Sequence, residues 1–544
     1  MEAGAMDKLT LTILETSDVH GYLFPGDGRE KDQEMEMGLF KAATVIHEEK
    51  HKADGPVLVI DNGDFIQGSP LSSYMERERG TAEPMIGALN TMEIDAGVPG
   101  NHEFNHGLFY MMESVRAAQF PVLAANILDE TGEPITGKAY EIFVKDGVRI
   151  AVLGLVTRYI PHWEHPDHCA GLTFRSAVDS AKEYVPMLRE IADVVVVSYH
   201  GGLECDLESG EPTEMLTGEN EGYALLTEVQ GIDVLLTGHQ HRKIAAIKNG
   251  IPVIQPGYRG EAVGKVTLEL ERQEDAWRIN GCGASLVEVK GKEEDPVLTK
   301  RFTGLKDEME AWLDRPVGGI VGDMSIKDAH DARISGHAYV DFINRVQMHH
   351  SGCAISATSL FSKEAEGFPP SVTMRDIVTN YLYPNTLAVC RVSGSDLKEA
   401  LELSASYFEL GPDGEIGINP EFIHPKPQHY NYDMYAGIEY TIDLTRPPGD
   451  RITVLIHEGH LIKPDETLEI VLNQYRAVGG GGYHMFGPSK ITREIRVPMT
   501  ELIAGYFKEH PVVSAIQIRN FEVIRSGFGN EEDDVLNLQL ENRA

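Results

Sequence analysis

A chain of 544 residues is longer than one hydrophobic core can support, so we expect two large domains. Its apolar fraction of 42% and charged fraction of 24% are typical of globular proteins and argue against wholesale disorder. The formal net charge of −37 makes polymeric nucleic acid an unfavourable partner. A small anionic substrate fits only where bound divalent cations reverse the local field.

Cysteine usage and the N-terminal residues indicate the cellular compartment of the protein. The five cysteines are scattered and include no C-x-x-C, which predicts buried free thiols rather than a disulfide framework. The N-terminal residues enter an apolar strand pattern at once, without the signature of a signal peptide. No apolar run is long enough to span a membrane. We expect a cytoplasmic chain, or a secreted, cell-wall or periplasmic form from which a signal was removed. The oligomeric state is left open.

Short apolar runs alternate with helical patterns between residue 10 and about residue 260. Many are β-branched and apolar on both faces, as in strands that are covered on both sides. The runs are LTILET, PVLVIDNGD, IDAGVPGN, VRIAVLGLV, ADVVVVSYH, GIDVLLTGH and IPVIQPG. They predict an α/β layered sandwich domain, with β-sheets flanked by helices, over residues 1–290.

Polar side chains follow five of these runs at the point where each predicted strand ends. Ligands bind beyond the carboxyl ends of strands in open α/β sheets, so these side chains are expected to meet at one edge. They are Asp18 and His20, then Asp64, then Asn101 and His102, then His200, and finally His239 and His241. Carboxylate, amide and imidazole groups are the ligands that two cations bridging a phosphate require. Each pair alone is weak evidence, but the ordered set predicts a metal site.

The second half of the chain begins with an amphipathic helix. Leu298, Phe302, Leu305, Met309 and Trp312 recur at helical spacing, Pro296 suits the first turn, and Pro316 ends the pattern. We assign residues 291–316 to a linker helix. Helical patterns such as VSGSDLKEALELSASYF mix with strand patterns such as GIEYTIDL and ETLEIVLN in residues 317–544. This mixture predicts an α+β C-terminal domain.

The ordered ligand set resembles that of calcineurin-like metallophosphoesterases. More narrowly, DNGDFIQGSP at 61–70 and GNHEFNHG at 100–107 resemble bacterial 2',3'-cyclic-nucleotide 2'-phosphodiesterase/3'-nucleotidases, within the 5'-nucleotidase superfamily. The resemblance implies two divalent ions, such as zinc, manganese or another transition metal. It also implies the ligands: Asp18, His20 and His241 on one metal, Asn101, His200 and His239 on the other, and Asp64 bridging both. His102 would be the catalytic imidazole near the leaving group.

Two segments depart from the 5'-nucleotidase pattern. Asn105 stands where those enzymes usually have an Asp that orients and charges the catalytic histidine. An asparagine still accepts a hydrogen bond but stabilises imidazolium less, so either a subfamily mark or reduced activity is implied. ISATSLF at 355–361 replaces the Asn-Gly-Gly-Gly-Ile-Arg loop that helps to bind 5'-substrates. Its absence counts against a 5'-nucleotidase.

The C-terminal domain resembles the nucleotide-reading domain of the same family. YLYPNT at 381–386, NYDMYAGIEYTID at 431–443 and NQYRAVGGGGY at 473–483 carry the resemblance. Relatives clamp a base between two aromatic rings, and Tyr432 and Tyr483 are the matching positions. Stacking suits this task because every base has a π-face. Arg476 is a further candidate for contact with phosphate or ribose. The alternative is that these tyrosines are core residues and the arginine lies on the surface.

The predicted function is two-metal hydrolysis of nucleotide phosphate esters. A 2',3'-cyclic nucleotide would open to the 3'-phosphate, which the same site would then hydrolyse. The alternatives are a 5'-nucleotidase or UDP-sugar hydrolase with a modified C-terminal domain, and a catalytically idle nucleotide-binding protein. None of the predicted metal ligands is missing, which counts against the idle alternative.

Overall fold

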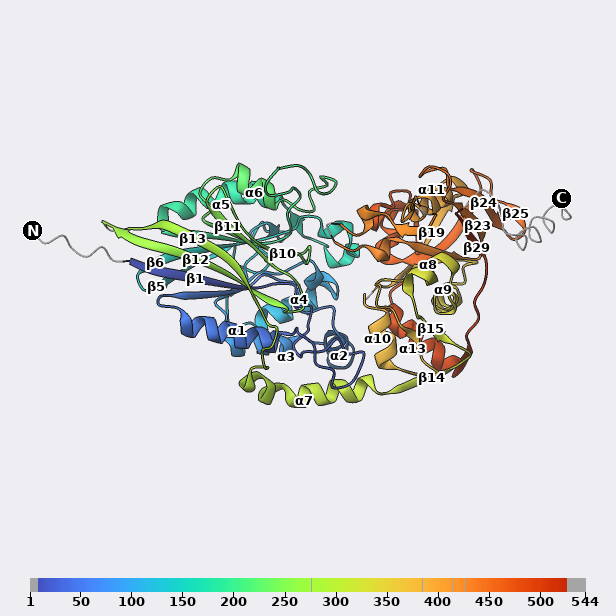
Figure 1. Cartoon of the computed structure of the whole chain (residues 1–544), viewed down its shortest axis with the longest axis horizontal. Coiled ribbons are helices and arrows are strands. Elements are labelled where there is room, and N and C mark those ends of the chain that lie inside the picture. The colour runs from blue at the N-terminus through green and yellow to red at the C-terminus, as the bar shows by residue number, and fades with distance from the viewer. Residues whose placement is uncertain (1–7, 275, 384, 413, 425, 526–544) are drawn as a thin grey trace, which may run out of the picture. The chain divides into compact units, whose positions relative to one another are not determined.

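The computed structural model describes residues 8–525, except residues 275, 384, 413 and 425 (Figure 1). The chain divides into two compact units, Met1–Leu313 and Asp314–Ala544. Strands and helices occur in both, so the predicted order of an α/β domain followed by an α+β domain is confirmed. All five cysteines are free, as the sequence predicts, but only Cys205, Cys353 and Cys390 are buried, whereas Cys169 and Cys282 are half-buried. No helix in the described residues combines the length and apolar character that crossing a membrane requires.

Two sheets form the centre of the first unit. One has the strand order β13-β12-β1-β2-β3, and the other has the order β10-β11-β9-β8-β6-β5. The strands of the first sheet are β1 (Lys8–Thr16), β2 (Val57–Asp61), β3 (Ala96–Gly97), β12 (Ala262–Gln273) and β13 (Ala276–Glu288). Those of the second are β5 (Tyr140–Lys145), β6 (Val148–Val156), β8 (Val194–His200), β9 (Val234–Thr237), β10 (Lys243–Lys248) and β11 (Ile251–Pro256). Each of the seven predicted runs therefore forms a strand.

The two sheets share one core. Leu11, Ile13 and Leu58 of the first sheet belong to the same buried cluster as Val152 and Val196 of the second. Helix α1 (Leu39–Lys52) lies along the first sheet, and α5 (Ala177–Ile191) and α6 (Gly222–Glu228) lie along the second (Figure 1). Apolar strands that are covered on both faces account for the continuous Val, Ile and Leu runs in the sequence.

The shorter elements of this unit lie in the connections between the strands. The helices are α2 (Pro70–Tyr74), α3 (Glu83–Met92) and α4 (Gly107–Ala117), and the paired short strands are β4 (Ile127–Leu128) and β7 (Thr173–Phe174). Single turns occur at His102–Phe104, Ile160–His162 and Pro166–His168. The loops that follow β3 and β6 therefore contain single helical turns close to the strand ends.

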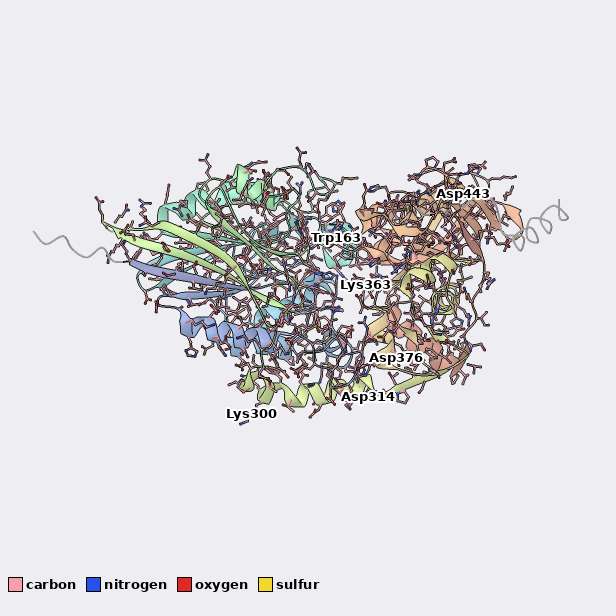
Figure 2. All side chains as sticks on the ribbon, viewed as in Figure 1. Trp163, Lys300, Asp314, Lys363, Asp376 and Asp443 are labelled. Carbon is pink, nitrogen blue, oxygen red and sulfur yellow. The ribbon has the colours of Figure 1, made fainter. Side chains whose placement is uncertain are left out.

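The predicted linker helix is α7 (Pro296–Leu313), on which Figure 2 labels Lys300. Its apolar face packs on the first unit. The ring of Phe302 lies 5.8 Å from that of Phe40, and the ring of Trp312 lies 5.8 Å from that of Tyr74. The boundary between the two units falls after Leu313. By its packing, the helix belongs to the first unit rather than to a separate linker over 291–316.

The second unit is built on a five-stranded sheet with the order β22-β16-β26-β19-β27. These strands are β16 (Ile355–Ser359), β19 (Leu387–Ser393), β22 (Asp433–Ala436), β26 (Thr467–Asn473) and β27 (Ile491–Ile495). Smaller sheets join β14 (Pro316–Val321), β18 (Ser371–Thr373) and β28 (Val512–Ser514), and join β23 (Glu439–Asp443), β24 (Ile452–His457), β25 (His460–Leu461) and β29 (Phe521–Ile524). Two-stranded pairs join β15 (Met324–Ser325) to β17 (Gly367–Phe368) and β20 (Phe408–Leu410) to β21 (Ile416–Ile418).

The helices of this unit are α8 (Ala329–Ser335), α9 (Ala338–Ser351), α10 (Met374–Asn380), α11 (Gly394–Ala405), α12 (Gln474–Ala477) and α13 (Met499–Glu509). The predicted helix at VSGSDLKEALELSASYF is α11, which begins with a capping box between Ser393 and Asp396. The predicted strands GIEYTIDL and ETLEIVLN are β23 and β26.

Candidate metal centre

The strand ends of the first unit bring the predicted ligands into two adjacent clusters. One cluster follows β1 and β9, and the other follows β2, β8 and β9. The first consists of Asp18, His20 and His241, and the second of Asp64, His200 and His239. Within each cluster the candidate ligand atoms all lie within 4.8 Å of one another. Six of the seven predicted ligands therefore converge, and Asn101 joins them through His239.

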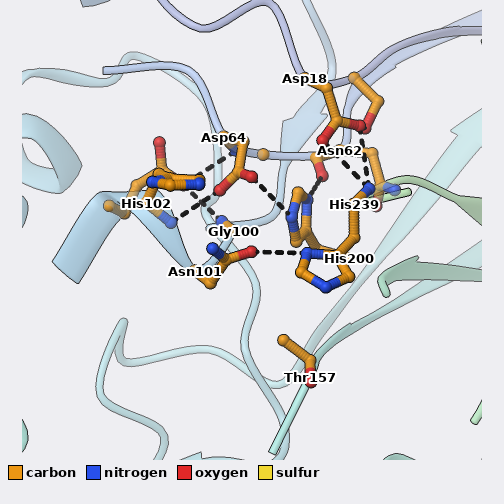
Figure 3. A network of polar contacts seen from close by, with 12 residues as sticks. Asp18, Asn62, Asp64, Gly100, Asn101, His102, Thr157, His200 and His239 are labelled. Carbon is orange, nitrogen blue, oxygen red and sulfur yellow. Dashed lines mark hydrogen bonds and ion pairs between the residues drawn. The ribbon is translucent and has the colours of Figure 1, made fainter. Parts of the chain in front are cut away.

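Asp64 connects the two clusters, and Figure 3 shows its contacts with His102 and His200. Its Oδ2 lies 3.2 Å from His200 Nε2 and 3.9 Å from His20 Nε2. Its Oδ1 accepts a hydrogen bond of 2.7 Å from the backbone N–H of His102. The side chain is only 1% exposed. A carboxylate held in this position can contact a cation on either side, which is compatible with the bridging role that the resemblance implies for it.

Three of the imidazoles are oriented by acceptors that lie outside the clusters. His20 Nδ1 donates to the carbonyl of Gln67 at 2.9 Å, and His200 Nδ1 donates to the carbonyl of Asn62 at 2.6 Å. His239 Nε2 donates to Glu219 Oε1 at 2.8 Å. In the neutral form of each ring, the other nitrogen therefore presents its lone pair to the cluster. Metal-binding histidines are typically held in this way.

The inward-facing atoms fit cations better than they fit one another. His239 Nδ1 lies 2.8 Å from Asn101 Oδ1, and His20 Nε2 lies 3.0 Å from His241 Nε2. When His239 is neutral and carries its hydrogen on Nε2, the first contact places two acceptors together. A cation next to both would relieve their repulsion. Mixed nitrogen and oxygen donors of this kind suit divalent transition metals.

Burial and neighbouring charges together determine the charge of these side chains. Burial lowers the pKa of His20 to about 3, which keeps the ring neutral and able to bind metal. His200 behaves differently, because the charge of Asp64 outweighs burial and raises its pKa to about 10. The pKa of Asp64 is held well below its ordinary value, against burial, by His200 and His102. A cation bound here would take the place of the proton that the Asp64–His200 pair otherwise shares.

The backbone at the ligands is strained. Asp18, His20, Asp64, His239 and His241 all have φ between 52° and 68°, in the left-handed region that L-residues rarely adopt. Such strain tends to cluster at functional sites, where the surrounding structure enforces it. Gly100 is required for a different reason, because a Cβ there would lie 2.2 Å from Asp64 Oδ1. The loops are thus shaped to place ligands.

Two carboxylates that support the centre were not predicted from the sequence. Buried Glu103 accepts hydrogen bonds from the backbone N–H groups of Asp64, Phe65 and Ile66, at 2.9, 2.7 and 3.1 Å. It therefore fixes the loop that carries Asp64. Glu103 lies inside the GNHEFNHG motif, so this motif could have identified it from the sequence. Glu219, which orients His239, lies outside the sequence motifs described above.

His102 lies at the rim of the centre rather than among the ligands. Its ring is edge-on to that of His20, with the centroids 5.2 Å apart. Its Nδ1 lies 2.7 Å from Asn105 Oδ1. The ring is half-buried, so it remains open to a molecule that approaches the metals. This placement is compatible with the predicted role near a leaving group.

The structure corrects the interpretation of the C-terminal residues. Tyr432 and Tyr483 are both 0% exposed, and Arg476 is 1% exposed. Tyr432 donates its hydroxyl hydrogen to the carbonyl of Arg333 at 2.9 Å, and the Tyr483 hydroxyl lies 2.9 Å from the carbonyl of Asn431. Neither ring presents a face to solvent, so a base clamp formed by these two tyrosines is not supported.

Arg476 is buried against Asp433 and Tyr483. Its Nε donates to Asp433 Oδ2 at 2.7 Å, and its guanidinium carbon lies 3.7 Å from the centroid of the Tyr483 ring. Its Nη2 donates to the carbonyl of Tyr430 at 2.8 Å. The arginine thus holds the loop before β22 in place, and direct contact with substrate is not supported.

Replacing Arg476 should therefore affect stability first. We expect Arg476→Ala to destabilise the second unit by about 3–5 kcal/mol, because it leaves Asp433 buried without a partner. Denaturant unfolding measures the loss. Arg391→Ala is the matched control, since its pair with Glu469 is exposed and contributes about 0–1 kcal/mol. An unaltered unfolding curve with a raised KM would instead support substrate contact by Arg476.

Two layered sheets that gather this ligand set at their strand ends define a metal-dependent phosphoesterase. The sequence matches the family model of calcineurin-like phosphoesterases over residues 11–243 and that of the 5'-nucleotidase C-terminal domain over residues 318–488. The chain belongs to the 5'-nucleotidase superfamily of metal-dependent phosphoester hydrolases, in which these two domains are joined.

Relatives of known name match most of the chain. The 2',3'-cyclic-nucleotide 2'-phosphodiesterase/3'-nucleotidase of Salmonella typhimurium is 30% identical over 86% of this chain and 81% of its own length. The trifunctional nucleotide phosphoesterase YfkN of Bacillus subtilis is 27% identical over 96% of this chain, which spans 39% of YfkN. A Staphylococcus aureus crystal structure, described as a candidate 5'-nucleotidase, has a TM-score of 0.89 and 40% identity, over 95% of this chain and 100% of that one.

Proposed function

We propose that the protein hydrolyses phosphate esters of nucleotides, opening 2',3'-cyclic nucleotides to 3'-nucleotides and then removing the 3'-phosphate. The observation that carries this proposal is the convergence of the two ligand clusters on Asp64, with His102 at the rim. Similarity to the Salmonella phosphodiesterase/3'-nucleotidase supports this substrate class.

The residues of the centre have separate roles in the proposed reaction. When bound, two divalent cations would neutralise the phosphate oxygens and activate water. Asp18, His20 and His241 would hold one cation, Asn101, His200 and His239 the other, and Asp64 both. His102 receives a fixed orientation from Asn105 and presents Nε2. In its protonated form it donates that hydrogen to the ribose oxygen that leaves phosphorus.

The second unit favours cyclic or 3'-substrates over 5'-nucleotides. Residues 355–359 form β16, and all five are buried. The segment therefore supplies no exposed loop and no arginine where 5'-nucleotidases, by the resemblance described above, bind their substrates. A 5'-nucleotidase remains the second candidate, supported by the similarity to the Staphylococcus aureus structure.

A substrate panel tests the proposal. With manganese or cobalt added, we expect 2',3'-cyclic AMP and 3'-AMP to be hydrolysed faster than 5'-AMP. Chelation with EDTA should abolish turnover and added metal should restore it. Preference for 5'-AMP would favour the 5'-nucleotidase. If the metal-loaded protein hydrolyses none of the three but binds them, the idle nucleotide-binding alternative is supported.

A different set of aromatic rings in the second unit is suited to stacking on a base. Tyr383, Tyr430 and Tyr475 are half-buried, and Phe361 packs edge-on against Tyr383 with ring centroids 5.3 Å apart. The Tyr430 ring lies 6.1 Å from that of Tyr383 and 6.3 Å from that of Tyr475. We infer that these tyrosines, rather than Tyr432 and Tyr483, receive the base. Tyr430 is central, and buried Arg476 fixes its carbonyl.

Replacing Tyr430 should weaken substrate binding. We expect Tyr430→Ala to raise KM for 3'-AMP about 5- to 150-fold, which corresponds to the 1–3 kcal/mol that stacking contributes per base. Initial-rate kinetics measure this change. Tyr430→Phe keeps the ring and should leave KM near that of the unaltered protein. An unchanged KM in Tyr430→Ala would remove Tyr430 from the base site.

A further inference from the structure

His102 stands at the end of a chain of polar contacts that leads away from the metal centre. His102 Nδ1 lies 2.7 Å from Asn105 Oδ1. At its other end, the Asn105 amide donates from Nδ2 to Glu164 Oε1. The second oxygen of that carboxylate, Oε2, lies 3.1 Å from His168 Nδ1. A carboxylate 59 residues further along the chain than Asn105 is thus linked to the catalytic imidazole through one amide.

Glu164 is held firmly in this position. Its side chain is only 9% exposed, and its backbone N–H donates to the carbonyl of Ile160 at 3.1 Å. The preceding residue, Trp163, lies against His239 with ring centroids 5.4 Å apart (Figure 2 labels Trp163). The loop after β6 therefore contacts the ligand His239 and the Asn105 amide through two consecutive residues.

Glu164 determines which end of the Asn105 amide faces His102. Asn105 could present either Oδ1 or Nδ2 to His102, and the two ends differ little in size. A carboxylate can only accept, so Glu164 binds Nδ2 and leaves Oδ1 for the histidine. Oδ1 in turn requires a hydrogen on His102 Nδ1. The contact with Glu164 thus selects the tautomer and ring orientation that direct Nε2 toward the metal centre.

We propose that Glu164 is a positioning residue for His102 and acts through Asn105. This inference rests on the proposed role of His102 as the group that protonates the leaving oxygen. Glu164 itself touches neither substrate nor metal in this scheme. Without its carboxylate, the amide is free to turn, and Nδ2 would then oppose the Nδ1–H of His102.

A merely structural role for Glu164 predicts a different outcome. If the glutamate only anchors its loop, its loss disturbs Trp163 and the centre as a whole. All substrates would then slow together. If it positions a proton donor, its loss matters most when the leaving group needs a proton. A ribose alkoxide needs one, whereas 4-nitrophenolate leaves readily without it.

The test compares four proteins on two phosphate monoesters, 3'-AMP and 4-nitrophenyl phosphate, each with the full complement of metal. The proteins are the unaltered chain, Glu164→Ala, Asn105→Asp and the double variant Asn105→Asp/Glu164→Gln. Glu164→Ala should lower kcat for 3'-AMP about 10- to 100-fold, the range for partners of functional ligands, with KM little changed. For 4-nitrophenyl phosphate the loss should be several-fold smaller.

The double variant separates positioning from folding. Asn105→Asp alone sets two carboxylates against each other and should lower kcat for 3'-AMP as strongly as Glu164→Ala does. In the double variant, the new amide at position 164 can donate to the new carboxylate at position 105, whose other oxygen accepts from His102 Nδ1. We expect this pair to recover most of the turnover that Asn105→Asp loses. A loop anchor would give no such rescue.

An exposed carboxylate in the same loop provides the control. Asp167→Asn removes an exposed carboxylate from the same loop and should leave both rates unchanged. Equal losses on both esters, or a double variant no faster than Asn105→Asp, would overturn the positioning role. If the unaltered protein does not hydrolyse 3'-AMP, the proposed substrate class fails instead. Comparing the same variants on glycerol 2-phosphate and 4-nitrophenyl phosphate then tests Glu164 separately, because glycerol is also an alkoxide leaving group.

Discussion

Asp64→Ala should abolish nearly all hydrolysis of 3'-AMP and lower the metal content of the protein. Asp64 is the carboxylate between His20 and His200, and its Oδ1 also accepts the backbone N–H of His102. Its removal takes away the shared ligand and leaves His200 without its counter-ion. Loss of a two-metal clamp costs several kcal/mol of transition-state stabilisation, or about 1000-fold or more in kcat. Rapid kinetics and elemental analysis of the metal-loaded protein measure both effects.

A buried carboxylate elsewhere in the first unit provides the control. Asp193 is 4% exposed and pairs with Arg149 at 2.9 Å, away from the ligand clusters. Asp193→Asn should lower the melting temperature yet leave the metal content unchanged. Asp64→Asn is a second test, because it keeps an acceptor for the N–H of His102 but removes the charge. If Asp64→Ala still binds two metals and turns over normally, the bridging role is excluded.

The convergence of the candidate ligands was predictable because strand ends repeat one simple rule. Val, Ile and Leu runs covered on both faces identify the strands, and parallel strands bring their carboxyl ends to one edge. Asp64 after β2 and His200 at the end of β8 follow directly from this pattern. Strand patterns do not predict the left-handed backbone that brings Asp18 and His239 together. That geometry depends on the packed loops.

Supporting residues escape prediction for a different reason. Glu219 and Glu164 lie in irregular loops, where neither periodicity nor spacing links them to the histidine or asparagine that they contact. Their roles appear only when distant segments are packed together. Glu103 is an intermediate case, because its motif is local but its backbone partners Asp64, Phe65 and Ile66 are not.

The tyrosines of the second unit illustrate a limit of residue type as a guide. Tyr432 and Tyr483 have the right chemistry for stacking, but burial decides whether a ring can be used. Just before β22, Tyr430 is half-buried while Tyr432 is enclosed, although Tyr430 directly precedes the motif that contains Tyr432. The sequence could not separate these neighbours, because Tyr432 is enclosed by the distant residues Arg333, Tyr407 and Phe408.

His102→Ala should reduce kcat for 3'-AMP about 100- to 10,000-fold, the range for loss of a positioned general acid. Metal content should stay unchanged, because Asn105 holds the His102 ring and its Nδ1 points away from both ligand clusters. The backbone N–H that donates to Asp64 Oδ1 is also retained. Hydrolysis of 4-nitrophenyl phosphate should suffer less, since its leaving group needs little protonation.

His162→Ala is the matched control for this substitution. The His162 ring is exposed and stacks on Tyr159 with centroids 3.8 Å apart, so its loss should leave kinetics and metal content unaltered. Depletion of metal in His102→Ala would instead make His102 a ligand. Equal losses on both esters would show that the ring acts on phosphate or water rather than on the leaving oxygen. Because the two results differ in metal content and in leaving-group dependence, a single variant distinguishes ligand, general acid and phosphate-binding roles for this histidine.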